Sequence, residues 1–351
     1  MSQHTSDNQT SASGVLLINL GTPDSPKVGD VRRYLREFLS DPYVIDIPTP
    51  LRFALVYGLI LPFRPRRSAK AYQQVWTDRG SPLRFHAEDL HQRLQDASLW
   101  QQPPGPVALA MRYGKPSIQA AFDQLQAAGI QHVKVFPMFP QYSESAWLTA
   151  AKACEKAAQL RRMTTSNVQP FYDHPSYLDV LASHTATHLD RCQPDKVLMS
   201  FHGLPERHMR KIDTSPTGHC LQRDHCCDAM VDANRNCYRA HCFATARGLA
   251  SRLGLGSDQW EVSFQSRLGR TPWIQPFTDH RIPKIAAAGC RRLAVVCPSF
   301  VADCLETIEE IGITADKSFQ EHGGEKLHLI PALNSHPAWV KVVAELIEAA
   351  D

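Results

Sequence analysis

Short apolar runs that end in polar or glycine-containing residues recur along the whole chain. They lie in GVLLINLGTP, VALAMRYG, HVKVFPMFPQYS, KVLMSFHG, WEVSFQSR, RLAVVCPSF and LHLIPALN. Runs of about five to seven apolar residues are typical of parallel strands buried on both faces. Between the first two runs, apolar and aromatic residues recur at helical spacing, at Val31, Tyr34, Leu35, Phe38 and Leu39. Strands alternating with helices predict an α/β fold of two similar, doubly wound, Rossmann-like domains whose parallel sheets face a central cleft.

The length of 351 residues also favours two domains, because a chain this long exceeds the usual size of a domain with a single hydrophobic core. We expect the break between the domains near residues 165–174. The expected segments are a disordered lead at 1–13, an N-terminal domain at 14–170, a C-terminal domain at 171–330 and a final helix at 331–351. The final helix is expected to cross back to the first domain.

Composition excludes several classes of protein. The net charge of +3 is near neutral and does not indicate a nucleic-acid-binding protein. No window holds the ~20 apolar residues that a membrane helix needs. The polar start MSQHTSDNQTSASG lacks the basic and apolar regions of a signal peptide. We therefore expect a protein of the reducing cytoplasm, where structural disulfides are rare.

Polar side chains follow several of the predicted strands. The candidates are Asn19 and Thr22, Arg112 and Tyr113, Tyr142 and Ser143, His202, Gln265 and Ser266, and Asp303. In open parallel sheets, ligands bind beyond the carboxyl ends of the strands. These residues are therefore expected to line the cleft between the two sheets.

A histidine and an acidic row form the strongest pair of candidates. His202 follows a predicted strand, and DCLETIEEI places Asp303, Glu306 and Glu310 on one face of a helix directly after another strand. Taken singly, the histidine could be hydrogen-bonded at a strand end, and the acidic residues could form an ordinary solvated face. Taken together, imidazole and carboxylates suit a borderline divalent metal.

The segment YGLILPFRPRRSAKAY mixes apolar residues with Arg64, Arg66 and Arg67. Its prolines are expected to break any helix. It is either a surface loop or a lip that touches a membrane interface or guides an apolar, anionic ligand. The sequence leaves both readings open.

Seven motifs resemble the ferrochelatase family from about Gly14 to the C-terminus. They are LLINLGTPDSP, FLSDPYVIDIP, LPFRPRRSAKAYQQVW, FPQYSESAW, SFHGLPERH, FQSRLGRTPWIQPFTD and CPSFVADCLETIEEI. The resemblance implies a chelatase-like fold, a catalytic histidine at His202, a glutamate opposite it at Glu306, and a further acidic residue at Glu310. It implies a porphyrin-lining role for Arg112, Tyr113, Tyr142, Ser143, Gln265 and Trp273. One departure is His208, where many relatives carry tyrosine.

The activity implied by the resemblance is insertion of Fe²⁺ into protoporphyrin IX, the last step of haem biosynthesis. Insertion removes two pyrrole N–H protons, and a histidine of near-neutral pKa can accept such a proton or ligate iron. Three alternatives stay open. The preferred porphyrin could be coproporphyrin III, and the protein could be a non-catalytic haem- or metal-binding protein of the same fold. The protein is either a monomer or a homodimer. Weak peripheral contact with the inner face of the membrane is also expected.

About twenty residues, within 213–238, interrupt the resemblance to simple bacterial relatives. They carry Cys220, Cys226, Cys227 and Cys237 in the pattern C-x5-C-C-x9-C. Four thiolates can hold zinc or an Fe–S cluster, and the pattern lacks the paired C-x2-C common in structural zinc sites. The segment resembles a subset of bacterial ferrochelatases with a [2Fe–2S] cluster in an internal insertion. We therefore expect [2Fe–2S], with zinc as the alternative.

The other cysteines are expected to be ordinary thiols. Cys242 matches a lone cysteine of the ordinary family helix, and Cys304 is expected to point away from the acidic face. Burial in apolar or helical runs explains the rest. These are Cys154, Cys192, Cys290 and Cys297.

Overall fold

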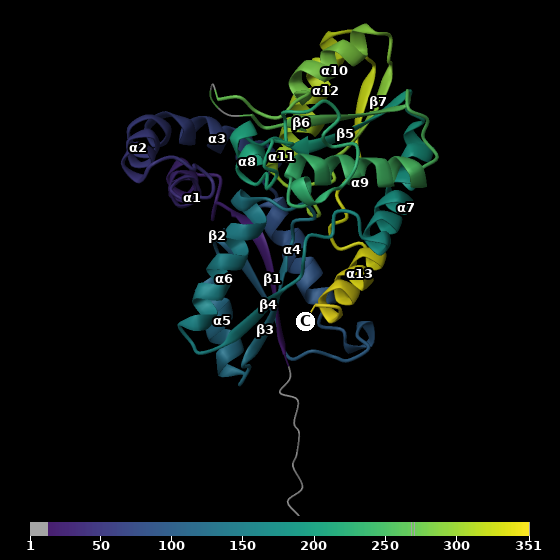
Figure 1. Cartoon of the computed structure of the whole chain (residues 1–351). Coiled ribbons are helices and arrows are strands. Elements are labelled where there is room, and N and C mark those ends of the chain that lie inside the picture. The colour runs from purple at the N-terminus through teal and green to yellow at the C-terminus, as the bar shows by residue number, and fades with distance from the viewer. Residues whose placement is uncertain (1–12, 268, 270, 351) are drawn as a thin grey trace, which may run out of the picture.

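The chain folds into two four-stranded parallel sheets with helices on both faces (Figure 1). The computed structural model describes residues 13–267, 269 and 271–350, so the expected lead lies, except for residue 13, outside the described residues. The first sheet has the order β2-β1-β3-β4 and the second the order β6-β5-β7-β8. Every neighbouring pair of strands in both sheets is parallel. The predicted α/β fold with two similar, doubly wound sheets is confirmed.

The strands fall where the apolar runs predict them, with one addition. The first sheet contains β1 (Gly14–Thr22), β2 (Val107–Gly114), β3 (His132–Pro137) and β4 (Thr164–Asn167). The second contains β5 (Lys196–His202), β6 (Trp260–Gln265), β7 (Arg292–Val296) and β8 (Lys326–Leu329). Strand β4 was not predicted, because its sequence TTSN is polar and lies, only partly buried, at the edge of its sheet.

Helices connect the strands in both halves. The first half contains α1 (Val28–Leu39), α2 (Thr49–Phe53), α3 (Leu61–Val75), α4 (Pro82–Arg93), α5 (Ile118–Ala127) and α6 (Thr149–Gln159). The second contains α7 (Pro175–Cys192), α8 (Glu206–Lys211), α9 (Tyr238–Arg252), α10 (Thr278–Ala287), α11 (Leu305–Thr307), α12 (Asp316–Glu321) and α13 (Pro337–Glu348). Three π-helical segments are η1 (Ala54–Ile60), η3 (Glu144–Leu148) and η5 (Ile308–Ala315), and two short 3₁₀ turns are η2 (Ala97–Leu99) and η4 (Asp232–Asn234).

Alternation along the strands divides the core between the two faces of each sheet. In β1, Leu16 and Ile18 face the core formed with α5 and α6. Val15 and Leu17 belong to a larger core that also contains Met199 of the second sheet. One continuous core therefore joins the two halves of the molecule.

The final helix, α13, packs against the first half of the molecule (Figure 1). The ring of Trp339 is fully buried and lies 6.4 Å from the ring of Phe136 on β3 and 5.8 Å from that of Phe171. The carbonyl of Glu348 accepts a hydrogen bond of 3.2 Å from Lys134. These contacts attach the end of the chain to the first sheet.

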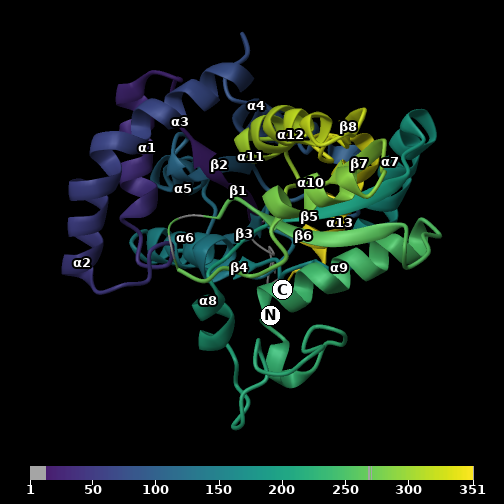
Figure 2. The same ribbon diagram turned by 90° about the horizontal axis from the view of Figure 1, so that it is seen from above.

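The segment from Thr49 to Val75 forms α2, η1 and α3, and we refer to it as the lip (Figure 2). The prediction that its prolines break any helix is wrong, since α3 contains Pro65 and begins with Leu61 and Pro62. Pro62 lies in the first turn, where backbone N–H groups have no partner within the helix. The π-helical segment η1 directly precedes that turn.

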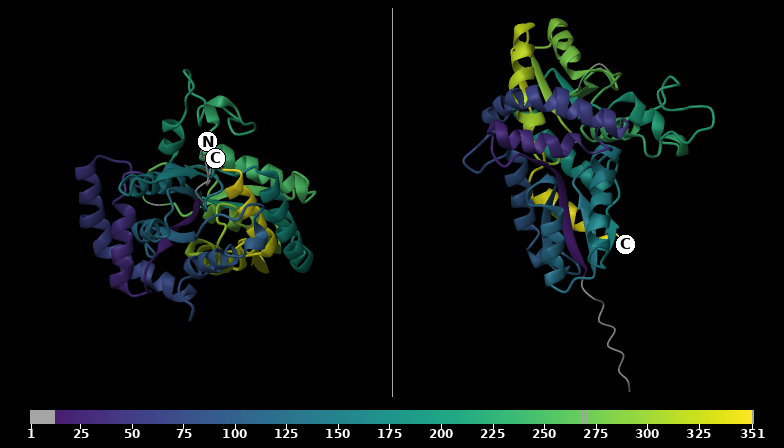
Figure 3. Two further views of the ribbon diagram at one scale, coloured as in Figure 1. Left: turned by 90° about the horizontal axis from the view of Figure 1, so that it is seen from below. Right: turned by 90° about the vertical axis from the view of Figure 1, so that its left-hand side faces the viewer.

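Two further features concern the surface. The cysteine-rich segment between α8 and α9 projects from the body of the molecule (Figures 2 and 3). No helix among residues 13–267, 269 and 271–350 is long and apolar enough to span a membrane.

Candidate active site

His202 ends β5, with its ring partly buried. Its Nδ1 lies 2.6 Å from the carbonyl oxygen of Gly203. A carbonyl oxygen only accepts, so Nδ1 carries the proton and Nε2 keeps its lone pair. Burial lowers the pKa of His202, although Glu306 and the Gly203 carbonyl oppose this shift. The neutral ring is therefore able to ligate a metal or accept a proton through Nε2.

Gly203 allows a close approach between the His202 turn and β6. A Cβ atom at this position would lie 2.7 Å from the carbonyl oxygen of Gln265. That same carbonyl accepts a hydrogen bond of 2.7 Å from the Gly203 N–H. The side chain of Gln265 is 2% exposed and donates through Nε2 to the carbonyl oxygen of Glu306 at 2.8 Å. Gln265 thus connects the histidine turn to the acidic helix.

Glu306, on α11, faces the lip and its neighbours in the first half of the molecule. Burial, with a contribution from Glu306, raises the pKa values of Tyr34 and Tyr72. Arg64 also faces Glu306, and its buried Nη1 has no hydrogen-bond partner among the described residues. Leu305 packs against the core of the lip. The lip therefore covers the side of the acidic helix that carries Glu306.

Glu310 lies on η5 and is bound by Ser266, the first residue after β6. Its two carboxylate oxygens accept hydrogen bonds from the Ser266 backbone N–H at 2.8 Å and the Ser266 hydroxyl at 2.5 Å. Ser266 has a φ of +67°, an uncommon conformation for a residue with a side chain. Burial raises the pKa of Glu310 to about 7, with smaller contributions from Glu306 and Glu309. Glu310 can therefore exchange a proton near neutral pH.

One detail of the acidic row differs from the sequence prediction. Asp303 does not share the face of Glu306, because its carboxylate accepts hydrogen bonds from Asn334 Nδ2 at 2.8 Å and Thr307 Oγ1 at 2.9 Å. Cys304 is buried and packs with Leu83 and Ala302. Burial, followed by the Glu306 carboxylate, raises the pKa of the Cys304 thiol.

Arg112 and Tyr113, at the end of β2, converge on Asp41. The Asp41 Oδ2 accepts hydrogen bonds from Arg112, from the Tyr113 hydroxyl at 2.9 Å and from the Thr149 hydroxyl at 2.7 Å. The guanidinium of Arg112 also lies 4.5 Å from the centre of the Tyr113 ring. Tyr113 is 1% exposed, so the structure places its ring inside this network.

Tyr142 and Ser143 follow β3 and precede η3. Tyr142 is partly buried, and its backbone N–H donates to Nδ1 of His241 at 3.2 Å. Ser143 is buried. Trp273 is partly buried and pairs through a β-bridge with Pro205, three residues after His202. Tyr142 and Trp273 are thus near segments that connect to the histidine turn.

The four insertion cysteines are all buried. The Sγ atoms of Cys226 and Cys227 are 3.8 Å apart. The Cys237 thiol donates to the sulfur of Met209 at 3.8 Å, and the Cys220 thiol donates to the carbonyl oxygen of Ala233 at 3.9 Å. The nearby Cys237 thiol, together with burial, raises the pKa of the Cys227 thiol. Arg239 donates to the sulfur of Cys227 at 3.1 Å.

Backbone and side-chain hydrogen bonds fold the insertion back on itself. Asp213 accepts from the backbone N–H of Cys220 at 2.7 Å, and Asn234 donates to the carbonyl of Cys226 at 2.9 Å. The N–H of Leu221 donates to the sulfur of Cys226 at 3.4 Å. In the described part of the chain, no group of three or more His, Cys, Asp or Glu side chains is placed to hold a metal ion.

Comparison with known proteins agrees with this geometry. The family model for Ferrochelatase matches residues 12–351. The chain belongs to the ferrochelatase family. It is 48% identical to the ferrochelatase of Ectopseudomonas mendocina (strain ymp) over 96% of the chain and 97% of that protein. The ferrochelatase of Coxiella burnetii (strain Dugway 5J108-111) is 47% identical over 95% of the chain and 92% of that protein.

A solved structure is more distant. The sirohydrochlorin chelatase SirB from Bacillus subtilis subspecies spizizenii, in complex with cobalt, covers 96% of the chain at 10% identity and a TM-score of 0.49. A match this weak carries no argument about the site of this ferrochelatase.

Several features of the site were not predicted from the sequence. Asp41 lies inside the motif FLSDPYVIDIP, so the motif itself was the available signal. Ser266 was predicted to line the cleft because it follows a strand, but only the structure shows its contact with Glu310. The inward position of Arg64 had no signal, because RPRR does not distinguish a buried arginine from an exposed one.

Proposed function

We propose that the protein inserts Fe²⁺ into protoporphyrin IX to form protohaem. The observation that carries this proposal is the pairing of His202 with Glu306: a neutral imidazole, oriented by Gly203, interacts with a carboxylate on the opposite helix. Membership of the ferrochelatase family supports the same reaction.

His202 is the proposed proton acceptor. Insertion replaces two pyrrole N–H bonds with iron–nitrogen bonds and releases two protons. Nε2 of His202 accepts a proton from the porphyrin, and the positive charge of the resulting imidazolium is stabilised by Glu306. The bond from Nδ1 to the Gly203 carbonyl fixes the ring orientation in both protonation states.

Glu306 and Glu310 are proposed to carry protons away or iron inward. Glu310 is suited to proton transfer, because its pKa of about 7 lets it take up and release a proton at neutral pH. The π-helical segment η5 holds Glu310 near Glu306, and π-helical turns are frequent at functional sites. The residues proposed to bind or support the porphyrin are Arg112, Tyr113, Tyr142, Ser143, Gln265 and Trp273.

Anaerobic incubation with Fe²⁺ or Zn²⁺ and protoporphyrin IX, followed through the Soret absorbance, tests the proposal. Formation of the metalloporphyrin at enzymatic rates is expected. Folded protein that binds porphyrin without turnover would instead indicate a non-catalytic haem- or metal-binding protein. A rate on coproporphyrin III well above that on protoporphyrin IX would reassign the substrate.

We further propose that Cys220, Cys226, Cys227 and Cys237 hold a [2Fe–2S] cluster. Such a cluster takes two thiolates on each iron. The adjacent Cys226 and Cys227, whose sulfurs are 3.8 Å apart, would each bind a different iron, and Cys220 and Cys237 would supply the other two thiolates. N–H donors from Leu221 and Arg239 point at two of the sulfurs, as a charged cluster requires.

A structural or sensing role fits this cluster better than a catalytic one, since insertion of a metal requires no electron. Iron and acid-labile sulfide analysis, with visible absorption, distinguishes the alternatives. About two iron and two sulfide per chain are expected. Stoichiometric zinc without sulfide would contradict the cluster.

We also propose weak contact of the lip with a membrane surface. Large apolar side chains are exposed along it: Leu51, Phe53, Tyr57, Leu59 and Phe63. Arg66 and Arg67 are exposed beside them, whereas Arg64 is only partly exposed and faces Glu306. Apolar side chains flanked by basic residues suit an anionic membrane surface.

A further inference from the structure

We propose that α8, the short helix after the His202 turn, is a positioning element that holds the lip and η3 in a fixed place relative to His202. This inference rests on the proposed function, in which the lip covers a bound porphyrin. It assigns roles to Arg207 and Lys211, which are not among the proposed catalytic or porphyrin-binding residues.

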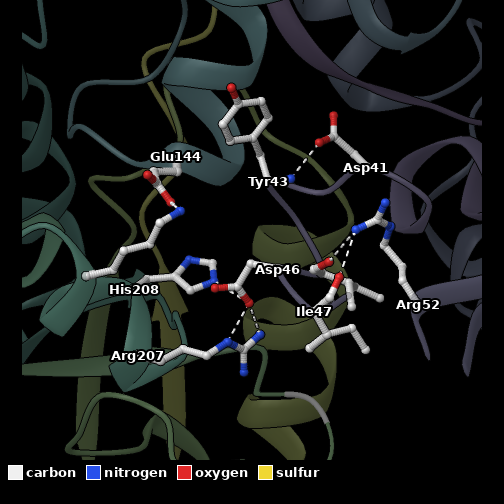
Figure 4. A network of polar contacts seen from close by, with 10 residues as sticks. Asp41, Tyr43, Asp46, Ile47, Arg52, Glu144, Arg207 and His208 are labelled. Carbon is white, nitrogen blue, oxygen red and sulfur yellow. Dashed lines mark hydrogen bonds and ion pairs between the residues drawn. The ribbon is translucent and has the colours of Figure 1, made fainter. Parts of the chain in front are cut away.

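The first attachment joins α8 to the loop that leads into the lip (Figure 4). Arg207 forms an ion pair and hydrogen bond with Asp46, and His208 Nε2 lies 3.4 Å from the same carboxylate. Only 14% of the Asp46 side chain is exposed. Burial raises the pKa of Asp46, but Arg207 and His208 outweigh this effect and hold the pKa below its usual value. The Arg207–Asp46 ion pair therefore contributes more to the attachment than an ordinary surface ion pair would.

The Asp46 loop is in turn fixed to the first helix of the lip. Arg52 on α2 is 7% exposed and donates to the carbonyl oxygen of Ile47 at 3.0 Å and to that of Ile45 at 3.4 Å (Figure 4). It also donates to the Thr49 hydroxyl at 3.2 Å. Because Asp46 lies between these two carbonyls, its position and that of α2 are linked.

The second attachment joins α8 to η3. Lys211 Nζ lies 2.6 Å from Glu144 Oε2, and 13% of the Glu144 side chain is exposed. Glu144 directly follows Tyr142 and Ser143, the candidate porphyrin contacts after β3. A single helix of six residues therefore contacts both first-half segments that flank the site.

The fixed end of α8 is the histidine turn itself. The Glu206 N–H donates to the Pro272 carbonyl at 3.0 Å, and Pro205 pairs with Trp273. On its buried side, Met209 is 2% exposed, and its sulfur lies 3.8 Å from Cys237 Sγ. Changes in the packing of the cysteines therefore reach α8 through Met209.

The consequence is a division of roles. Breaking the ion pairs of α8 loosens the lip and η3 but leaves intact the hydrogen bonds of Gly203, Gln265 and Ser266, which hold the three catalytic candidates from within the second half of the molecule. Porphyrin binding is then weakened, while the insertion step is unchanged, so KM for porphyrin rises and kcat is retained.

A charge exchange tests the inference with full-length protein containing its native metal content. Arg207→Asp is expected to raise KM for protoporphyrin about tenfold with kcat within about twofold. The double variant Asp46→Arg/Arg207→Asp is expected to recover most of the loss, because it restores an opposite pair in the same place. The pair Glu144→Lys/Lys211→Glu provides the same test for the second attachment.

Hydrogen exchange gives a readout independent of activity. Arg207→Asp is expected to speed amide exchange over residues 49–63, with recovery in the charge-exchanged variant. Arg210→Asp, which breaks only a pair with Glu206 within α8, is the matched control and should leave exchange in the lip unchanged.

The outcomes separate this inference from the proposed function. Absence of insertion by the wild-type protein would contradict the proposed function alone, and the exchange data would still test α8. An active wild type whose Arg207→Asp variant keeps its KM and lip exchange would overturn the inference. A fall in kcat without a change in KM, or a charge exchange that restores nothing, would do the same.

Discussion

The side chain of Gln265 donates a hydrogen bond of 2.8 Å to the backbone carbonyl of Glu306, across the gap between β6 and the acidic helix. Its Oε1 accepts a hydrogen bond of 2.7 Å from the Ser200 hydroxyl on β5. Gln265 is therefore tied on one side to the strand that carries His202 and on the other to the helix that carries Glu306. The distance between the two catalytic candidates depends on this buried amide.

Gln265→Met retains most of the side-chain volume but removes these two hydrogen bonds and the one that Oε1 accepts from the Cys297 thiol at 3.7 Å. We expect the free energy of unfolding to fall by about 1–3 kcal/mol, because buried polar groups lose their partners. Turnover should fall about tenfold, because Glu306 is no longer held opposite His202. Denaturant unfolding and steady-state insertion rates measure the two effects.

Ser200→Ala is the control for this variant. It removes one partner of Gln265 and leaves the bond to Glu306 intact, so kcat should stay within about twofold of wild type. Full turnover by Gln265→Met would show that Glu306 does not depend on this contact.

The raised pKa of Glu310 predicts a pH-dependent contribution to stability. Its pKa is about 7 in the folded protein against an ordinary value of 4.5. Protonated Glu310 stabilises the folded protein, and this contribution to the free energy of unfolding amounts to at most about 3 kcal/mol. The contribution is fully present below about pH 4.5 and is lost as the pH rises to about 7. Glu310→Gln should flatten the dependence of the unfolding free energy on pH across this range.

Glu321→Gln provides the matched control, since Glu321 is an exposed carboxylate paired with Lys317 on α12 and its replacement leaves the Ser266 contacts of Glu310 in place. Its unfolding free energy should vary with pH as in the wild type. Equal slopes for Glu310→Gln and the wild type between pH 4.5 and 7 would rule out a buried, titrating Glu310.

His202→Ala removes the proposed proton acceptor. Insertion should fall by at least about a hundredfold, and the dissociation constant for protoporphyrin should change by no more than about twofold. Glu306→Gln should lower turnover about ten- to a hundredfold, because it removes the charge that faces His202. Fluorescence titration with porphyrin and single-turnover insertion separate binding from chemistry.

If His202→Ala kept most of the activity, its assignment as proton acceptor or iron ligand would be wrong. His241→Ala is not a suitable control, because His241 is buried and bonded to the backbone of Tyr142. His322→Ala is suitable, since His322 is exposed at the end of α12.

The sequence predicted the strands well, because buried parallel strands are recognisable as apolar runs. It failed for β4, whose polar residues are held in the sheet only by pairing with β3. It failed again for the lip, where proline signals a break in isolation but is accepted in the first turns of α3. The pairing of a strand and the position of a proline within a helix depend on the folded structure, so local composition does not predict them.

The sequence predicted the types of residue in the site better than their contacts. Helical spacing predicted Asp303 on the same helix face as Glu306, whereas the carboxylate of Asp303 is hydrogen-bonded to Asn334. The helix begins only at Leu305, so Asp303 precedes it and the expected periodicity does not apply. Partners distant in sequence, such as Ser266 for Glu310, become visible only once the strands are assembled.

The cysteine site predicts a selective response to substitution. Cys227→Ser should remove the visible absorption and most of the iron and sulfide, since each iron of the proposed cluster needs two thiolates. Cys290→Ser, which changes a partly exposed thiol outside the insertion, should leave both unchanged. Activity should fall in Cys227→Ser together with thermal stability, because the bound cluster contributes to folding of the insertion. A colourless, metal-free Cys227→Ser protein with wild-type stability and activity would show that the insertion folds without a metal.

The lip predicts weak, salt-sensitive binding to anionic vesicles. Its exposed apolar side chains, including Leu59 at 64% and Phe63 at 73%, would insert at the headgroup level, while Arg66 and Arg67 meet the anionic surface. Each basic residue contributes about 1 kcal/mol, so Arg66→Glu/Arg67→Glu should weaken flotation with phosphatidylserine-containing liposomes at least tenfold. The control Arg291→Glu/Lys317→Glu makes the same change in net charge on the second half of the molecule and should bind as the wild type does. Equal flotation of all three proteins, or flotation that persists at 1 M salt, would show that the basic residues of the lip do not direct the contact.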